Sequence, residues 1–275
     1  MDFDFQHITV PFSMQPGLVR MEPGARHLTQ LDPGSDLYQE KLSVSRASAC
    51  LHCVPGFDPS DGLRAVRQHA DTTGVRALLS APMATELAFE EDLALLDAAT
   101  GSVPWMCVCV PSHWAPEDKI GKSLAAIHAP VADSAALNAA LPHLMTLVCG
   151  GSHWERFVWT LSPSPRYDQH PRRRPSHAWP TTSDPAEFAA GCYLRAERQT
   201  FMPVHDELGR PMRQAVFTIR VIVEALTDVI RGPEQAQRLH DALQSMSSKV
   251  LGYKNLATAR TPLLAWLSDR QADTA

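Results

Sequence analysis

Hydrophobic residues recur along the chain with the spacings of strands and helices. The apolar run at 104–110 is short, unbroken and bounded by prolines, which favours a buried strand. Two late runs are separated by a segment containing Gly209 and Pro211, which is typical of a turn in a β-hairpin. Besides 104–110, the predicted strands cover 157–161, 192–201 and 214–223.

Other segments carry apolar residues at helical spacing. The segment 82–99 predicts a helix, and a second begins at Ser112 or Pro116 and ends before Pro130. Further helices are predicted at 133–148, from Gly232-Pro233 to about Val250, and around 263–267. Mixed elements with antiparallel pairing late in the chain predict the α+β class.

A proline-rich stretch separates two of these predicted strands. Six prolines lie within 162–187, and proline lacks an N–H donor, so this stretch can be neither one helix nor a central strand. We interpret it as a long ordered loop rather than a linker between domains. The chain is therefore expected to form one domain, 1–275, with this loop inside it.

Composition narrows the function classes. The 275 residues are 44% hydrophobic and 20% charged, as in an ordinary globular protein. A net charge of -5 gives no overall positive field for nucleic acid or an anionic membrane. The chain has no apolar run long enough to span a bilayer and no recognisable signal peptide at its start, so a cytoplasmic location is expected.

The cysteines and a basic run are open to two interpretations each. Cys50 and Cys53 form a CxxC pair, which could be half a zinc site or a redox pair. A zinc site needs four ligands, and no second pair of matching spacing follows. Covalent c-type haem would need histidine where Val54 stands. A structural role is therefore favoured for the pair. The run 172–174 of three arginines is expected to be a solvated loop tip, with docking of an acidic partner or of a substrate carboxylate as the alternative.

His128 ends a predicted amphipathic helix on its apolar side, with Leu124 and Ile127. Such a histidine is usually a core residue with one hydrogen bond. It is also where a haem protein would place an axial ligand, and Lys119 and Lys122 on the same helix could reach haem propionates. Spacing alone favours the structural role.

A dense polar cluster occupies the predicted strand at 192–201. Arg195 and Glu197 share one face of this strand, and Arg198 points to the other. One interpretation is an exposed strand with cross-strand ion pairs. The other is a buried carboxylate beside an arginine, which could bind a cationic substrate and relay protons.

Several segments together resemble one family, the haem-dependent oxidative N-demethylases. The resemblance runs from about Leu79 to Leu226, with a weaker echo at Tyr253-Lys254. Its segments are 110–122 (a tryptophan–lysine–glycine motif), 127–131 (histidine–proline–valine), 195–200 with 216–220 (paired late strands) and, in part, 156–159. One departure is Val158, where the family often has asparagine, and this change favours a substrate unlike a small methylamine.

The resemblance implies a PAS-like fold that binds haem b, with His128 as the axial ligand to iron. It makes Glu197 and Arg195 candidates for the oxygen-activating and substrate-facing groups. The candidate pocket walls and cofactor contacts are Trp114, Lys119, Lys122, Trp159 and Arg198. Should His128 not be the ligand, the next candidates are His7, His113 and His153.

The implied activity is that of a haem-dependent monooxygenase acting on nitrogen. The family includes the haem protein of D-cycloserine biosynthesis, so our specific expectation is N-hydroxylation of the L-arginine guanidinium in antibiotic biosynthesis. Alternatives are oxidative N-demethylation of a small amine, a haem-based gas or redox sensor, and a binding protein without haem. Molecular oxygen and an external reductase are the expected partners, because the sequence has neither a glycine-rich dinucleotide fingerprint nor a four-cysteine iron–sulfur set.

Overall fold

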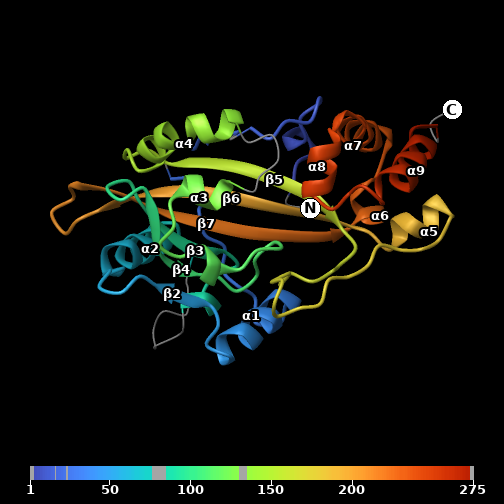
Figure 1. The fold of residues 1–275 in the computed structure, drawn as a ribbon. Coiled ribbons are helices and arrows are strands. Elements are labelled where there is room, and N and C mark those ends of the chain that lie inside the picture. The colour runs from blue at the N-terminus through green and yellow to red at the C-terminus, as the bar shows by residue number, and fades with distance from the viewer. Residues whose placement is uncertain (1–2, 16, 23, 76–84, 130–134, 273–275) are drawn as a thin grey trace.

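The computed structural model describes residues 3–15, 17–22, 24–75, 85–129 and 135–272. Within these residues the strands form an antiparallel sheet in the order β1-β5-β6-β7-β3-β4-β2 (Figure 1). The strands are β1 (Val19–Arg20), β2 (Leu51–Cys53), β3 (Asp92–Asp97), β4 (Ser102–Cys107), β5 (Trp154–Ser162), β6 (Tyr193–His205) and β7 (Pro211–Ala225).

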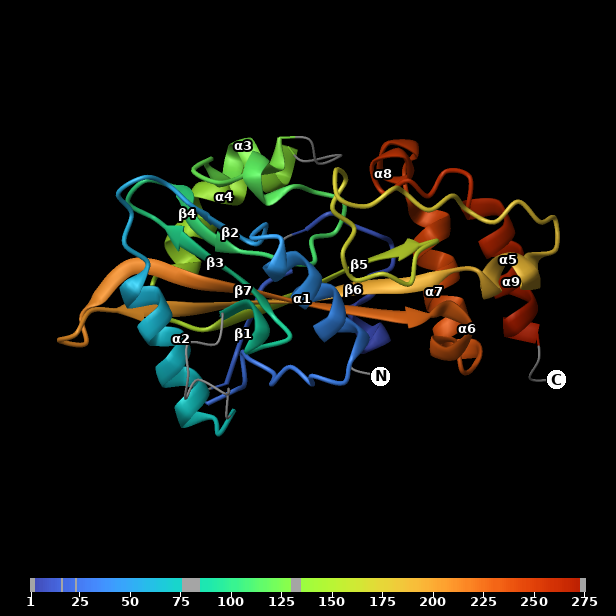
Figure 2. The same cartoon turned by 90° about the horizontal axis from the view of Figure 1, so that it is seen from below.

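The helices flank this sheet, which gives the α+β class that the sequence predicts. Figure 2 shows α3 and α4 over one face and α2 on the opposite side, while α6, α7 and α9 gather at one end of the long strands. The α-helices are α1 (Asp36–Arg46), α2 (Ser60–Thr72), α3 (Leu124–His128), α4 (Ala135–Val148), α5 (Pro185–Ala190), α6 (Leu226–Val229), α7 (Pro233–Ser245), α8 (Ser248–Tyr253) and α9 (Arg260–Ala272). Short 3-10 helices are η1 (Phe5–His7), η2 (Thr85–Leu87) and η3 (Pro116–Asp118). None of the described helices has the length and apolar character needed to cross a membrane.

The β6–β7 hairpin forms the centre of the sheet. The strands pair from Tyr193 opposite Ala225 to His205 opposite Pro211, so each is longer than the sequence predicts. The Asp206 carboxylate accepts hydrogen bonds from the backbone N–H groups of Leu208 and Arg210, both at 2.9 Å. Gly209 supplies the positive φ of +74° that closes the turn. The predicted hairpin is confirmed, and its continuous pairing makes a platform on which other elements pack.

The prediction of a helix at 82–99 is wrong for residues 85–99, which the structure describes. They contain η2 and then strand β3. β3 lies between β7 and β4, so the run 93–96 is buried on both faces of the sheet. Such a run lacks the alternation that marks a half-buried strand. The acidic residues before it have partners in the structure: Glu90 pairs with Arg220 at 2.5 Å and Asp92 with Lys41 at 3.0 Å.

The helix predicted from Ser112 or Pro116 to Pro130 is shorter than expected. η3 ends at Asp118, and Gly121, with a φ of +73°, lies in the turn that separates it from α3. His128 still ends α3, as the last residue of that helix. The predicted helix reaching Val250 is also divided, because Met246 is extended and Ser247 caps the separate helix α8 through the Val250 N–H. The predicted start of the next helix at Asp133 lies outside the described residues.

A buried histidine network joins the segment after β1 to the sheet. His27 is 1% exposed, and its Nδ1 lies 2.7 Å from the Thr200 hydroxyl while its Nε2 lies 2.7 Å from His153 Nδ1. His69 Nε2 accepts a hydrogen bond from the His27 backbone N–H at 3.1 Å. Burial, together with the neighbouring His69 and His153, lowers the pKa of His27 to about 3.

This network makes the fold sensitive to acid. The folded pKa of His27 lies below its ordinary value of 6.5, so the unfolded chain takes up a proton first as pH falls. Stability contributed by neutral His27 is therefore present above about pH 6.5 and is lost as pH falls toward 3, by up to about 1.4 kcal/mol per pH unit for one group.

The measurement is the free energy of unfolding in urea between pH 7 and pH 5. We expect His27→Gln, which cannot titrate, to give a flatter pH dependence than the wild type. His143→Gln, at an exposed position on α4, is the matched control and should keep the wild-type slope. Equal slopes for the wild type and His27→Gln would contradict the assignment.

Candidate functional site

A cavity of about 180 Å³ lies between the sheet and helices α3 and α4. Its polar lining consists of Lys119, His128, Arg156, Glu197 and Gln199. The rest of the lining is apolar: Leu18, Ala94, Leu96, Val103, Met106, Trp114, Leu124, Ile127, Leu141, Leu144, Val148, Phe201, Phe217 and Ile219. A mostly apolar pocket with a few convergent polar groups is the usual form of a ligand or cofactor site.

Glu197 lies on the cavity wall because β6 alternates its side chains between two faces. Residues 195, 197, 199 and 201 face one side of the sheet, and 194, 196, 198 and 200 face the other. The Glu197 carboxylate accepts a hydrogen bond from the Ser112 hydroxyl and another from Gln199 Nε2 at 2.6 Å. These two donors fix the carboxylate in one orientation while it still borders the cavity.

Two partly buried cations share this wall with Glu197. Arg156 pairs across β5 and β6 with Gln199, and its Nε donates to Gln199 Oε1 at 2.8 Å. Lys119 places its ammonium 5.1 Å from the centre of the Trp114 ring. Burial lowers the pKa of both Lys119 and Arg156, and the Glu197 carboxylate opposes that shift. The cavity therefore combines an apolar interior with cations that can receive anionic groups of a ligand.

His128 contributes a neutral imidazole to the opposite wall. Its Nδ1 donates a hydrogen bond to the Leu124 carbonyl at 2.8 Å, one turn back along α3. Burial lowers the pKa of His128, which favours the neutral ring. A neutral histidine that donates from Nδ1 carries its lone pair on Nε2, and that is the state in which histidine binds a metal.

Lys254 is a further partly buried cation, outside the cavity lining. Its ammonium donates to the Trp159 carbonyl at 2.7 Å. Burial lowers the pKa of Lys254 to about 8, against the attraction of Glu197. The Glu197 carboxylate thus favours the charged form of three partly buried cations.

The structure brings together half of the side chains that the sequence suggested. Trp114, Lys119, His128 and Glu197 all line the cavity. The cavity lining includes none of the others, which are Lys122, Trp159, Arg195 and Arg198. Lys122 is exposed on the turn before α3.

Arg195 is an internal anchor rather than a cavity residue. It is 1% exposed, and its guanidinium donates to the carbonyls of Val110 (3.2 Å), Arg166 (3.0 Å) and Tyr167 (2.8 Å). Its Nε donates to the Ser112 hydroxyl at 2.8 Å. Burial lowers the pKa of Arg195 to about 10. This location corrects the expectation that Arg195 faces a substrate: it holds the proline-rich loop behind Glu197.

Trp159 and Arg198 point to the face of the sheet away from Glu197. Trp159 packs in the core beside the C-terminal helices, with its ring 5.6 Å from that of Phe12. Arg198 donates from Nε to Glu155 at 2.9 Å and from Nη2 to the Arg26 carbonyl at 2.8 Å. The strand alternation explains both corrections, because neighbouring residues on a strand cannot share one pocket wall.

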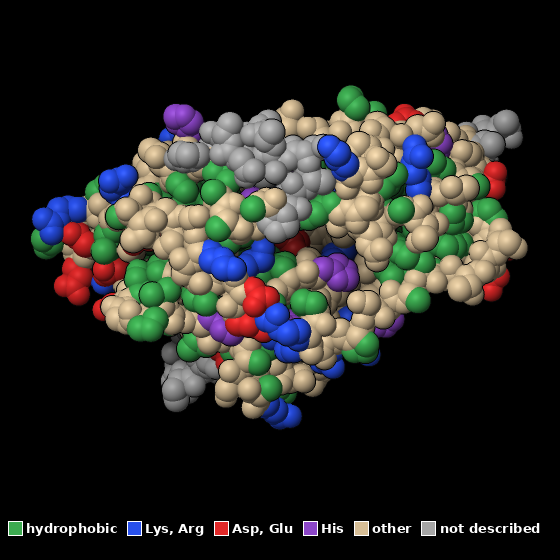
Figure 3. Space-filling model, in the orientation of Figure 1, with side chains coloured by type: hydrophobic (Ala, Val, Ile, Leu, Met, Phe, Trp, Pro, Cys, Tyr) green, Lys and Arg blue, Asp and Glu red, His purple; other side chains and the backbone are tan. Residues whose placement is uncertain are grey.

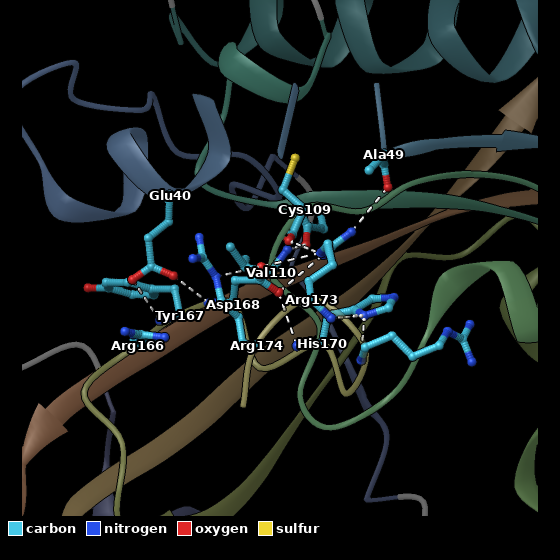
Figure 4. A network of polar contacts seen from close by, with 12 residues as sticks. Glu40, Ala49, Cys109, Val110, Arg166, Tyr167, Asp168, His170, Arg173 and Arg174 are labelled. Carbon is cyan, nitrogen blue, oxygen red and sulfur yellow. Dashed lines mark hydrogen bonds and ion pairs between the residues drawn. The ribbon is translucent and has the colours of Figure 1, made fainter. Parts of the chain in front are cut away.

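The arginine run at 172–174 forms ion pairs instead of a free loop tip. Figure 4 shows Arg173 reaching from the proline-rich loop toward Ala49 and Cys109, whose carbonyls accept its hydrogen bonds at 3.1 and 2.8 Å. Asp168, 1% exposed, pairs with Arg173 at 3.1 Å and with Arg174 at 3.5 Å. These contacts correct the expectation of a solvated tip, since they fasten the loop to the rest of the molecule.

The first arginine of the run forms ion pairs with another segment, the 3-10 helix η3. Arg172 binds the carboxylates of Glu117 (2.6 Å) and Asp118 (2.8 Å) of η3. Figure 3 shows basic, acidic and histidine side chains gathered near the middle of this face, where the surface is hollowed.

The sequence analysis did not assign Arg156, Gln199 or Ser112 to the site. The period of two along β6 adds Gln199 to the face of Glu197, so this residue could have been found from the strand pattern. Arg156 follows only from the register that places it opposite Gln199. Ser112 lies far from Glu197 in the chain, and only the tertiary structure brings their side chains into contact.

The other candidate histidines lie elsewhere. His7 stacks on Phe157 at 3.9 Å, His113 is exposed beside a separate small pocket, and His153 belongs to the network of His27. Among the histidines considered as ligands, His128 lines the cavity.

The anchoring role of Arg195 predicts a large stability effect. Arg195→Met leaves buried carbonyls without their donor, and we expect a loss of about 3 kcal/mol or more in the free energy of unfolding. Arg198→Met removes a partly exposed ion pair on the same strand and should cost about 1 kcal/mol. Urea denaturation of the two variants measures the difference, and equal losses would contradict the anchor.

Comparison with known families shows where the chain belongs. The model of the family described as haem-dependent oxidative N-demethylase, alpha subunit-like, matches residues 69–264, well over half of the chain. The matched region begins within α2 and ends within α9, and it includes every described element that lines the cavity after β1.

Proposed function

Because this chain belongs to the haem-dependent oxidative N-demethylase alpha subunit-like family, we propose that its cavity binds haem b and that the protein oxidises a nitrogen compound. His128 is the proposed axial ligand to the iron. The single observation that carries this proposal is the cavity itself, in which a neutral histidine, two partly buried cations, one carboxylate and one amide border a mostly apolar space.

The residues present fit haem. Apolar side chains from the sheet and from α3 and α4 suit the flat macrocycle, and the Nδ1 hydrogen bond of His128 leaves Nε2 for iron. Lys119 and Arg156 suit the two propionates, because both are cations on the cavity wall. The antiparallel sheet with helices on its faces also supports the PAS-like arrangement that we propose for the fold.

The charges also favour a cationic substrate. Propionates bound to Lys119 and Arg156 would balance the charges of both side chains, and Glu197 would then be the remaining charged side chain of the cavity lining. A guanidinium matches a carboxylate held in fixed orientation by Ser112 and Gln199. The substrate we propose is L-arginine, hydroxylated on the guanidinium as a step of antibiotic biosynthesis.

Bound haem supplies the activation of molecular oxygen, with electrons from an external reductase. The overall reaction consumes the substrate N–H, one O2, two electrons and two protons, and gives N–OH and water. Glu197 is placed to orient the substrate and to pass protons, since Ser112 Oγ–H and Gln199 Nε2–H hold the carboxylate on the cavity wall. Arg195 keeps Ser112 in place through its Nε hydrogen bond.

Oxidative N-demethylation of a small amine is the second candidate, and the family description favours it. The two reactions use the same cavity and differ in whether nitrogen or its methyl carbon is oxidised. Assays of the reduced protein with L-arginine and with dimethylamine separate them: a hydroxyguanidine product supports the first and formaldehyde supports the second. Stable oxygen binding without either product would instead support a sensor.

The haem proposal predicts a spectroscopic phenotype. His128→Ala should lose haem or shift the Soret band after reconstitution, because the iron loses its imidazole ligand. His143→Ala, an exposed histidine on α4, is the matched control and should keep the wild-type spectrum. A wild-type protein without a Soret band after reconstitution, or a His128→Ala spectrum equal to the wild type, would overturn the assignment.

Glu197→Gln should separate catalysis from haem binding. The amide keeps the shape of the side chain but loses the charge and the proton acceptor, so we expect product formation to fall by about 100-fold or more. The Soret band should be unchanged, because Glu197 is not the proposed ligand. Glu155→Gln, on the opposite face of the sheet, is the control. Turnover within threefold of the wild type, taking about threefold as assay scatter, would exclude this role for Glu197.

A further inference from the structure

Three potential metal ligands meet outside the cavity. Cys50, Glu86 and Cys107 come from the residue before β2, from η2 and from the end of β4, and their ligand atoms all lie within 4.8 Å of one another. The Cys107 sulfur lies 4.0 Å from Glu86 Oε2. In a tetrahedral zinc site with bonds of about 2.0–2.3 Å, ligand atoms lie about 3.5–3.8 Å apart. A small contraction would thus close the cluster around an ion.

A fourth potential ligand adjoins this group. Cys50 and Cys109 pack in one buried cluster, and the thiols of Cys50, Cys107 and Cys109 are all buried. Cys109 lies two residues beyond Cys107, in a bend that follows β4. We propose that Cys50, Glu86, Cys107 and Cys109 form a structural zinc site.

The surroundings of the cluster suit a bound cation. Ser45 on α1 donates to the second oxygen of Glu86 at 2.6 Å, an outer contact of the kind that orients a metal ligand. Cys50 and Cys107 are 4% and 2% exposed, so the cluster is largely enclosed by the protein.

The site is separate from the proposed haem cavity. Met106 lines the cavity, and the alternation of β4 turns the next side chain, Cys107, to the other face of the sheet. The proposed ion would link β2, β4 and η2, three segments far apart in the chain, and so stabilise this edge of the sheet. It is independent of the proposed oxidation chemistry.

The CxxC pair does not form this site. Cys53 is exposed, and its thiol contacts the carbonyls of Val54 and Phe57 at 3.4 and 3.5 Å. The antiparallel register of β2 and β4, with Leu51 opposite Cys107, brings Cys50 to cysteines more than fifty positions later. Spacing along the chain therefore gives no sign of the residues that lie near Cys50 in the fold.

The test is zinc stoichiometry of the full chain. Protein purified with a non-thiol reductant is equilibrated with Zn²⁺, freed of unbound metal and analysed by inductively coupled plasma mass spectrometry, which separates zinc from haem iron. We expect about one zinc ion per chain. Glu86→Gln should weaken zinc binding in a chelator competition by more than about 10-fold, and Cys50→Ser should weaken it further. Cys149→Ser, at a buried cysteine outside the cluster, is the matched control.

A second measurement uses only the wild type, so it tests the proposal even if the variants fail to fold. In the wild type, zinc should slow alkylation of Cys50, Cys107 and Cys109 and leave the rate at exposed Cys53 unchanged. The proposal is overturned if the reduced wild type retains no zinc, if Cys50→Ser and Glu86→Gln bind zinc as tightly as the wild type, or if zinc does not protect the cluster. A Cys50–Cys107 disulfide without zinc uptake after reduction would also overturn it and would indicate a redox pair.

Discussion

The site depends on one hydroxyl group, that of Ser112. It accepts a hydrogen bond from Arg195 and donates one to Glu197, so a single side chain joins the buried anchor to the cavity wall. Arg195 in turn holds carbonyls of the proline-rich loop and of the segment after β4. A buried guanidinium that makes four hydrogen bonds is costly to disturb, and this rigidity fixes the orientation of Glu197.

The proline-rich loop supports the site from behind. It has few backbone hydrogen bonds of its own, because prolines lack the donor, so its position depends on side chains. Glu40 on α1 accepts from the Tyr167 and Asp168 N–H groups at 3.1 and 2.6 Å, and Arg173 ties the loop to Ala49 and Cys109 (Figure 4). Cys109 thus contacts the loop through its carbonyl, and its sulfur is one of the proposed zinc ligands. One residue therefore connects the loop with the proposed zinc site.

β6 separates two tasks by its alternation. Its odd-numbered residues from 195 to 201 supply the anchor, the carboxylate, the amide and an aromatic wall, and the even-numbered residues pack against other elements on the opposite face. Burial lowers the pKa of the cations near Glu197, and the carboxylate opposes that shift. The charge balance of the cavity is therefore set by Glu197 on this strand together with Lys119, which follows η3, and Arg156 on β5.

The sequence by itself determined the α+β class, the β6–β7 hairpin, the position of His128 at a helix end and the shared face of Arg195 and Glu197, because these follow from local periodicity and turn chemistry. It could not tell that 93–96 is a central strand, since a run buried on both faces has no alternation. Only the tertiary structure decided that Arg195 is an anchor, that Arg156 joins the cavity and that Cys50 meets Cys107. Each of these depends on strand register or on a contact between distant segments, which no local pattern encodes.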